Sequence, residues 1–319
     1  MKTWLLPEAG QFYKANLHCH STVSDGKWSP ERIKEEYMAR GYSIVAYSDH
    51  DVCVSHNELT DESFLALTAY EANIKQDEGV KFSFARRYHL NCFARSPYAD
   101  GKEVTPAPDF QGVDAVNAFI ARLREAGFLV CYNHPNWSLQ TLTDYGDLRG
   151  LFACEIYNHS AMLDGIDADQ EQVYDALLRR GNRLFCVAAD DNHDNYPPEH
   201  PLNDSFGGFT VIKAPQLTYD AVFGALERGD FYASMGPEIR ALYVEDGDLC
   251  IETSPVRSIH MTNVGRDACV ERAARSSAVT CARFPIRPDS RFIRLQITDW
   301  EGMRANTNAY FLSDFMKSE

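Results

Sequence analysis

Histidine, aspartate and glutamate residues recur at the ends of seven short apolar runs in the first two thirds of the chain. These residue types supply the imidazole and carboxylate ligands that bind divalent metal ions. One such residue at a strand end is usually a satisfied polar group or a helix cap, but seven successive coincidences are hard to produce by capping. The residues are His18, His20, Asp25, Asp49, His50, Asp51, Glu71, His89, His134, Glu155, Asp190, Asp191 and His193.

The spacing of two residue pairs adds specificity to this pattern. His18 and His20 are two residues apart in an extended run, so both imidazoles face the same side and can bind one ion, while Cys19 faces the other side. Asp191 and His193 repeat the spacing after the last run. The sequence therefore predicts a polynuclear metal site, with no nucleophilic role for Cys19.

The elements that must position these residues follow a regular alternation. Apolar runs rich in Val, Ile, Phe and Tyr alternate with helical patterns, which is typical of βα units. About seven such units before residue 236 predict a closed or nearly closed βα barrel, where chemistry gathers at strand ends. The runs lie at 13–17, 42–48, 66–70, 88–93, 128–132, 152–157 and 184–189, and helical patterns start near 30 and cover 113–126 and 169–180.

The alternation changes after Gly236-Pro237. Alternating stretches at 239–244, 257–262 and 292–297 lie between Asp-Gly and Pro-rich turns, with no convincing helix. This pattern predicts a small β-sandwich. We expect two domains, at residues 1–236 and 237–319, and no constellation of metal ligands in the second.

The motifs, in their order along the chain, resemble those of the PHP (polymerase and histidinol phosphatase) superfamily. The resemblance covers roughly residues 12–195, and the tail resembles the branch that includes carbaryl-hydrolase-type enzymes. It implies an α/β fold, a distorted (βα)7 barrel of PHP type, followed by the small all-β domain. The motifs are His18-x-His20, Ser24-Asp25-Gly26, Ser48-Asp49-His50-Asp51, Glu71, His89, Asn133-His134-Pro135 and Asp191-x-His193.

The resemblance also implies two to three divalent ions, of zinc, manganese or iron, with Glu71 bridging two of them. Asp25 stands where some relatives use histidine, and its harder oxygen leans toward manganese or iron. The implied ligand sets are His18, His20, Glu71 and Asp191 for one ion, Asp25, His50 and His193 for a second, and Glu71, His89 and His134 for a third.

Closely spaced divalent ions lower the pKa of a shared water and clamp the oxygens of the group under attack. A phosphoryl group, with three oxygens, suits three ions best. We therefore expect a phosphoesterase acting on a small phosphorylated metabolite or nucleotide, with a metal-bound hydroxide held by Glu71, Asp191 and His193. No protein general acid or base is identified. The alternatives are a carbamate, ester or amide hydrolase using the same site, and a non-catalytic PHP module.

Other polar residues near the motifs have two interpretations each. In the first interpretation the residue orients a metal ligand or the substrate. In the second it caps a turn, forms a salt bridge or lies in a solvated loop. Three arginines, Arg86, Arg87 and Arg95, lie on either side of the His89 run in the sequence and are candidates for binding phosphate. The residues retained as candidates are Asp49, Asp51, Asn133, Glu155 and Arg95.

Composition limits the partners. The 319 residues carry a formal charge of -15, and residues 240–319 are neutral overall, so the excess acid lies in residues 1–239. Such a chain is poorly suited to long nucleic acids, but metal ions can bring in a small anion. No run of 18 apolar residues or signal-like start occurs, and nine cysteines form no C-x-x-C pair. We therefore expect a cytoplasmic protein with reduced thiols and no membrane segment.

Overall fold

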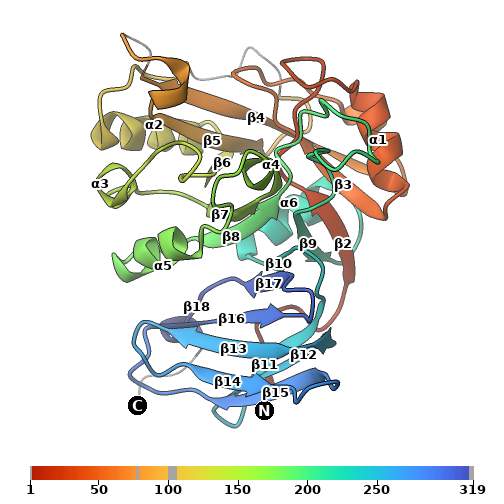
Figure 1. Ribbon diagram of the computed structural model, residues 1–319, viewed down its shortest axis with the longest axis vertical. Helices are drawn as coiled ribbons and strands as arrows, with labels where there is room; N and C mark the ends of the chain where they lie inside the picture. The colour runs from red at the N-terminus through yellow and green to blue at the C-terminus, as the bar shows by residue number, and fades with distance from the viewer. Residues whose placement is uncertain (1, 77–78, 100–105, 316–319) are drawn as a thin grey trace.

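The computed structural model describes residues 2–76, 79–99 and 106–315. It consists of an α/β region, drawn above an all-β region in Figure 1. All seven apolar runs form strands, as predicted. These are β2 (Gln11–Asn16), β3 (Tyr42–Tyr47), β4 (Leu65–Lys75), β5 (Arg87–Ala94), β6 (Phe128–Tyr132), β7 (Ala153–Asn158) and β8 (Phe185–Ala189).

The prediction of a (βα)7 barrel is not confirmed. The strands lie in the order β9 (Phe209–Ala214), β2, β3, β4, β5, β6, β7, β8, and the described sheet is not closed between β8 and β9. There the Thr210 hydroxyl of β9 bonds the backbone N–H and C=O of Ala188 in place of a ladder. The sheet is curved and nearly complete, but open along one seam.

Two strands of this sheet are reversed relative to a regular barrel: β9, which pairs antiparallel with β2, and β5. β5 pairs antiparallel with both β4 and β6, whereas β2, β3 and β4 are mutually parallel, as are β6, β7 and β8. In its described part, the connection from β4 to β5 contains only the 3-10 turn η2 (Phe82–Phe84), without a crossover helix. A parallel return needs a crossover, so β5 folds back beside β4 instead.

Four longer helices pack on the sheet: α1 (Pro30–Met38), α2 (Val113–Glu125), α5 (Glu171–Arg179) and α6 (Tyr219–Arg228). The predicted start of α1 is confirmed, because the Ser29 side chain caps the N–H of Arg32 and Pro30 is the first helical residue. Helix α2 buries Val116, Phe119, Ile120 and Leu123, one apolar face at helical spacing. Shorter helical segments are η1 (Asn57–Leu59), α3 (Leu142–Tyr145), α4 (His159–Leu163) and α7 (Leu312–Phe315).

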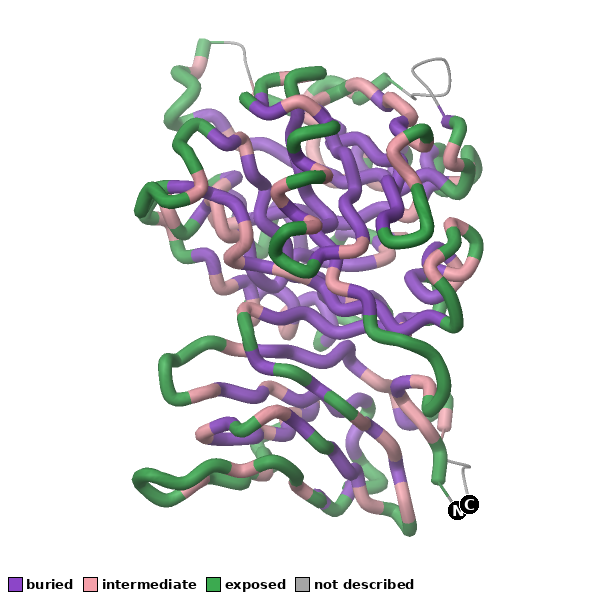
Figure 2. Tube along the Cα trace, turned by 90° about the vertical axis from the view of Figure 1, so that its right-hand side faces the viewer, coloured by how far each residue is buried: buried purple, intermediate pink, exposed green. Residues whose placement is uncertain are grey.

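The strands are buried on both sides, and the continuous purple trace in the upper part of Figure 2 follows them. Side chains on one side, such as Ile44, Leu67 and Val187, pack against α6. Those on the other side, such as Leu90 and Val130, pack against α2 and α5. None of the nine cysteines forms a disulfide in the described structure, and no described helix has the length and apolar character to cross a bilayer.

The all-β region contains two sheets around one apolar core that includes Leu242, Ile259 and Leu295. One sheet has the order β1, β11, β12, β15, and the other continues the large sheet through pairing of β10 with β17. Strand β1, near the beginning of the chain, therefore belongs to this region because it pairs with β11. The division into two domains at residue 236 stays a prediction. The strands are β1 (Lys2–Trp4), β10 (Phe231–Ser234), β11 (Ile239–Glu245), β12 (Asp248–Val256), β13 (Ser258–Asn263), β14 (Cys269–Arg272), β15 (Val279–Pro285), β16 (Phe292–Thr298), β17 (Arg304–Thr307) and β18 (Tyr310–Phe311).

Candidate metal centre

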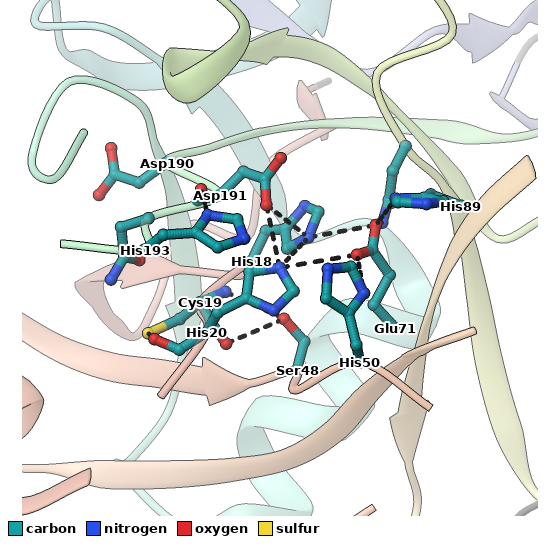
Figure 3. A network of polar contacts seen from close by, with 12 residues as sticks. His18, Cys19, His20, Ser48, His50, Glu71, His89, Asp190, Asp191 and His193 are labelled. Carbon is teal, nitrogen blue, oxygen red and sulfur yellow. Dashed lines mark hydrogen bonds and ion pairs between the residues drawn. The ribbon is translucent and has the colours of Figure 1, made fainter. Parts of the chain in front are cut away.

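The nine predicted ligands converge at one edge of the large sheet. Most follow the carboxyl ends of parallel strands, and His89 reaches the same edge because the reversed β5 begins there. Figure 3 labels most of these side chains, among them His18, Glu71 and Asp191, and shows their rings and carboxylates pointing toward one another. They form three overlapping groups whose donor atoms lie within 4.8 Å: His20, Asp25, His50 and His193; His18, Glu71, His134 and Asp191; and His50, Glu71 and His89.

These groups differ in detail from the ligand sets that the resemblance implied. His134 lies with His18 and Asp191 rather than with His89, and His20 groups with His50 and His193. The groups overlap, however, since Nε2 of His18 and Nε2 of His20 each lie 3.0 Å from Oδ1 of Asp191. Glu71 belongs to two groups, as expected of a bridge. The division into individual ion sites stays a prediction.

Several buried donor atoms in this cluster lack hydrogen bonds, which tests whether the residues fit a metal ion. Both ring nitrogens of His89 are unpaired, as are Nδ1 of His50 and Oε2 of Glu71. Nδ1 of His50 nevertheless lies 3.0 Å from Oε2 of Glu71, and Nδ1 of His89 lies 3.0 Å from Oε1 of Glu71. Buried polar atoms are almost always hydrogen-bonded. Donor atoms that lie this close together without forming hydrogen bonds are arranged as the ligands of shared metal ions would be.

Outer contacts fix three imidazoles so that Nε2 faces the cluster. His18 donates from Nδ1 to Oε1 of Glu155 at 2.7 Å, and His193 donates from Nδ1 to the Asp191 carbonyl at 3.0 Å. The Ser138 hydroxyl bonds Nδ1 of His134. Such partners set the tautomer and orientation of metal-binding histidines. The contacts of Glu155, which also accepts from the His134 N–H, favour the orienting interpretation over a surface salt bridge.

The remaining polar candidates hold the surrounding backbone or a ligand. Asp49 accepts from the N–H and hydroxyl groups of Ser21 and Ser24, and so shapes the loop that presents Asp25. Asp51 accepts from the Asn73 N–H at 2.9 Å and is exposed. Both aspartates therefore join chain segments that are 22 to 28 residues apart in the sequence, and these contacts do not involve a predicted metal ligand.

Asn133, like Glu155, touches a predicted ligand directly. Its side-chain N–H donates to Oε1 of Glu71 at 2.7 Å. This contact fixes the carboxylate that two groups share.

The structure does not bring Arg95 to the centre. Arg95 lies just past the end of β5, pairs with Glu227 and stacks on Phe223. Arg86 pairs with Asp144 at 2.7 Å. Arg87, which was not retained as a candidate, lines the cavity beside His89. The signal for it was its place two residues before His89, on the same side of the strand.

Cys19 confirms the predicted alternation. It is fully buried among Trp28, Ile33 and other apolar side chains, on the side of the strand opposite His18 and His20. Burial raises the pKa of its thiol well above the usual value. The thiol is therefore an apolar packing group.

The electrostatics of the metal-free cluster are set by opposed effects. Burial opposes ionisation of Glu71, but His89, His18 and His50 hold its pKa well below the usual value. Burial also works against a charged His50, yet the Glu71 carboxylate outweighs it and raises the pKa to about 9. For His20, burial and the neighbouring His193 lower the pKa to about 4. At neutral pH the cluster combines ionised carboxylates with a neutral His20 and a protonated His50.

The backbone is strained or tightly packed where it presents these residues. His134 and Asp191 have positive φ values of 22° and 57°, which are costly for residues with a Cβ. At Gly26 a Cβ atom would lie 2.4 Å from the His20 carbonyl oxygen, so only glycine fits the loop there. Unusual backbone of this kind concentrates at functional sites.

A cavity of about 560 Å³ opens above the cluster. Its base is formed by the predicted ligands, and its wall includes Phe82, Trp137, Leu163 and Leu202. This volume is in the range that binds small molecules.

Comparisons with known proteins give a partial sequence match and several distant structural matches. No family model matches the sequence. A 5'-3' exoribonuclease of Haemophilus influenzae is 39% identical over 70 residues, which cover 22% of this chain and 23% of that protein.

Among solved structures, a two-domain protein of Bacteroides vulgatus containing a predicted PHP-like metal-dependent phosphoesterase covers 96% of this chain and 98% of its own, at 14% identity and a TM-score of 0.47. An amidohydrolase of Chromobacterium violaceum with bound sulfate and no metal covers 58% of this chain and 92% of its own, at 13% identity and a TM-score of 0.38. At these values the likeness by itself assigns no activity.

Proposed function

We propose that the protein is a PHP-type metal-dependent phosphoesterase that hydrolyses a small phosphorylated metabolite or nucleotide at a site of two or three divalent ions. The observation that carries this proposal is the set of buried imidazole and carboxylate atoms, several of them without hydrogen bonds, that converge at one cavity. When bound, such ions supply an activated water near neutral pH and neutralise charge on phosphoryl oxygens.

The residues of this chain would position those ions. Glu71 would hold two of them, because its oxygens face different histidines and Asn133 fixes its orientation. Asp191 would hold one of these ions together with His18 and His134, since its Oδ1 lies 3.0 Å from Nε2 of His18 and its Oδ2 lies 3.5 Å from Nε2 of His134. The complete ligand series argues against a non-catalytic module.

A carbamate, ester or amide hydrolase remains the second candidate, because apolar side chains line part of the cavity. Leu163, Leu202 and Phe82 could receive the uncharged part of such a substrate. A phosphoesterase instead needs a cation or several donors near the ions, and Arg87 stands in the same wall. The two candidates differ in the charge of the group attacked, so an activity panel separates them.

The test combines metal analysis with that panel. We expect purified protein to carry divalent metal and to hydrolyse phosphomonoesters or phosphodiesters faster than carboxylic or carbamate esters. Chelation should abolish activity, and added Zn²⁺, Mn²⁺ or Fe²⁺ should restore it. Activity that survives complete removal of metal would overturn the proposal, and activity confined to uncharged esters would replace it with the second candidate.

A further inference from the structure

Arg87 is the single Lys or Arg side chain among the described residues that line the cavity. The lining also includes five carboxylates, those of Asp25, Glu71, Asp164, Asp191 and Asp204. We propose that Arg87 binds the phosphoryl oxygens of the substrate on the side away from the metal ions. This inference rests on the proposed phosphoesterase function and narrows it to substrates with an anionic group under attack.

The strand geometry places Arg87 toward the metal cluster. Arg87 and His89 are two residues apart at the start of β5, so their side chains leave the same face of the strand. Both line the same cavity. A guanidinium there lies beside a predicted metal ligand, which is where a metal-bound phosphoryl group presents its remaining oxygens.

Local contacts hold Arg87 in this position. Its backbone N–H donates to the Ser138 carbonyl at 3.2 Å, and its carbonyl accepts from the Gln140 side chain. The guanidinium carbon lies 4.4 Å from the centre of the Phe82 ring. Stacking on an aromatic face orients the planar group but uses none of its N–H donors. The side chain is therefore positioned while its hydrogen-bonding edge stays available.

The absence of an ion pair distinguishes Arg87 from its neighbours. Arg86 pairs with Asp144 and Arg95 pairs with Glu227, whereas Arg87 has no carboxylate partner among the described residues although it is only 7% exposed. Desolvating a cation without a partner is costly, so such residues are normally paired. A planar guanidinium matches a phosphate in a bidentate manner, and the anion would complete its hydrogen bonding.

The matched variants are Arg87→Gln, Arg87→Lys and, as control, Arg95→Gln, which removes the same charge away from the cavity. Binding of inorganic phosphate to the metal-loaded protein is measured by titration calorimetry, after metal content and folding have been checked for each variant. We expect Arg87→Gln to weaken phosphate binding about 10- to 100-fold, the usual effect of losing hydrogen bonds to a charged group. Arg87→Lys should weaken it less, and Arg95→Gln should change it less than twofold.

The outcomes separate this inference from the proposed function. Equal phosphate binding by wild type and Arg87→Gln overturns the role of Arg87 and leaves the phosphoesterase proposal standing. If wild type binds no phosphate and cleaves only uncharged esters, the phosphoesterase proposal fails and the inference falls with it. Should Arg87→Gln fail to fold, Arg87→Lys decides, because unweakened binding there contradicts a bidentate contact.

Discussion

The two regions of the molecule bury opposite kinds of side chain. The edge of the large sheet at the metal centre buries charged and polar groups, such as His18, Glu71 and Glu155, at essentially zero exposure. The all-β region buries Ile259, Leu295 and other apolar residues in one core between its two sheets. Burying apolar surface stabilises a fold, whereas burying unpaired polar atoms costs stability. The comparison indicates that the first region maintains a costly arrangement and that the second adds apolar stabilisation.

Backbone geometry differs in the same way. At the centre, positive φ values occur at the buried residues His134 and Asp191. In the all-β region, Asp246 and Gly247 adopt positive φ in the exposed turn between β11 and β12, where such values suit a hairpin. Positive φ thus suits a hairpin turn at these positions of one region and falls on candidate ligands in the other.

Among substitutions that test this contrast between the two regions, Glu71→Gln should have the largest effect on metal content and activity. Because Glu71 belongs to two ligand groups, the variant should lose two ions together and lower kcat/KM by more than about 100-fold, beyond the usual effect of changing an outer contact. Metal per chain is measured by atomic spectroscopy, with the exposed Glu62→Gln as matched control. Unaltered metal content in this variant would contradict the bridging role of Glu71.

A smaller effect is expected for Glu155→Gln. This residue touches the cluster through Nδ1 of His18, so the substitution should leave every ligand in place but lower metal affinity about 10- to 100-fold. Competition with a chromophoric chelator measures the change. Wild-type affinity in this variant would mean that His18 needs no outer partner.

Metal binding should depend on pH through His50. Its pKa of about 9 in the metal-free protein means that its imidazole is protonated at pH 7 and must lose that proton to bind an ion. Metal affinity should therefore rise from pH 7 to about 9 and then level off. Calorimetry in buffers of different ionisation enthalpy should detect the released proton, and His50→Asn should release less. An affinity that is constant between pH 7 and 9 contradicts this prediction.

The smallest effect on chemistry is expected from the core of the all-β region. Leu295→Ala removes a fully buried side chain and should lower the free energy of unfolding by about 2–5 kcal/mol. Activity per folded molecule should change less than about twofold, because the described structure places no candidate ligand in that core. Denaturant unfolding and kinetics on the same sample test both statements. A large loss of kcat with intact folding would show that the two regions are coupled.

The strands and the candidate ligands could be predicted because both leave local signals in the sequence. Apolar runs marked the strands, and the polar residues at their ends, such as Glu71 and His134, were placed together by the rule that strand ends share an edge. The direction of β5 leaves no such signal. Side chains alternate between the two faces of a strand in the same way whichever direction the strand runs. The sequence therefore could not show that β5 begins, rather than ends, at the metal centre.

That missing direction explains why Arg95, and not Arg87, was retained as a candidate. Arg87 and Arg95 both lie an even number of residues from His89, so alternation assigns them to the same face. They differ in distance along the strand, since six residues of extended chain span about 20 Å. Only the observed orientation of β5 puts Arg87 at the cavity and Arg95 at the opposite edge of the sheet.

The pairing of β1 with β11 has a consequence for synthesis of the chain. Lys2 pairs with Glu245 and Trp4 pairs with Tyr243. Strand β1 is therefore synthesised about 240 residues before the strand that it pairs with. Everything that forms the metal centre lies inside the loop that this pairing closes. On the ribosome the α/β region can therefore begin to fold before the all-β region is complete, and the edge of β11 is covered only when both have been made.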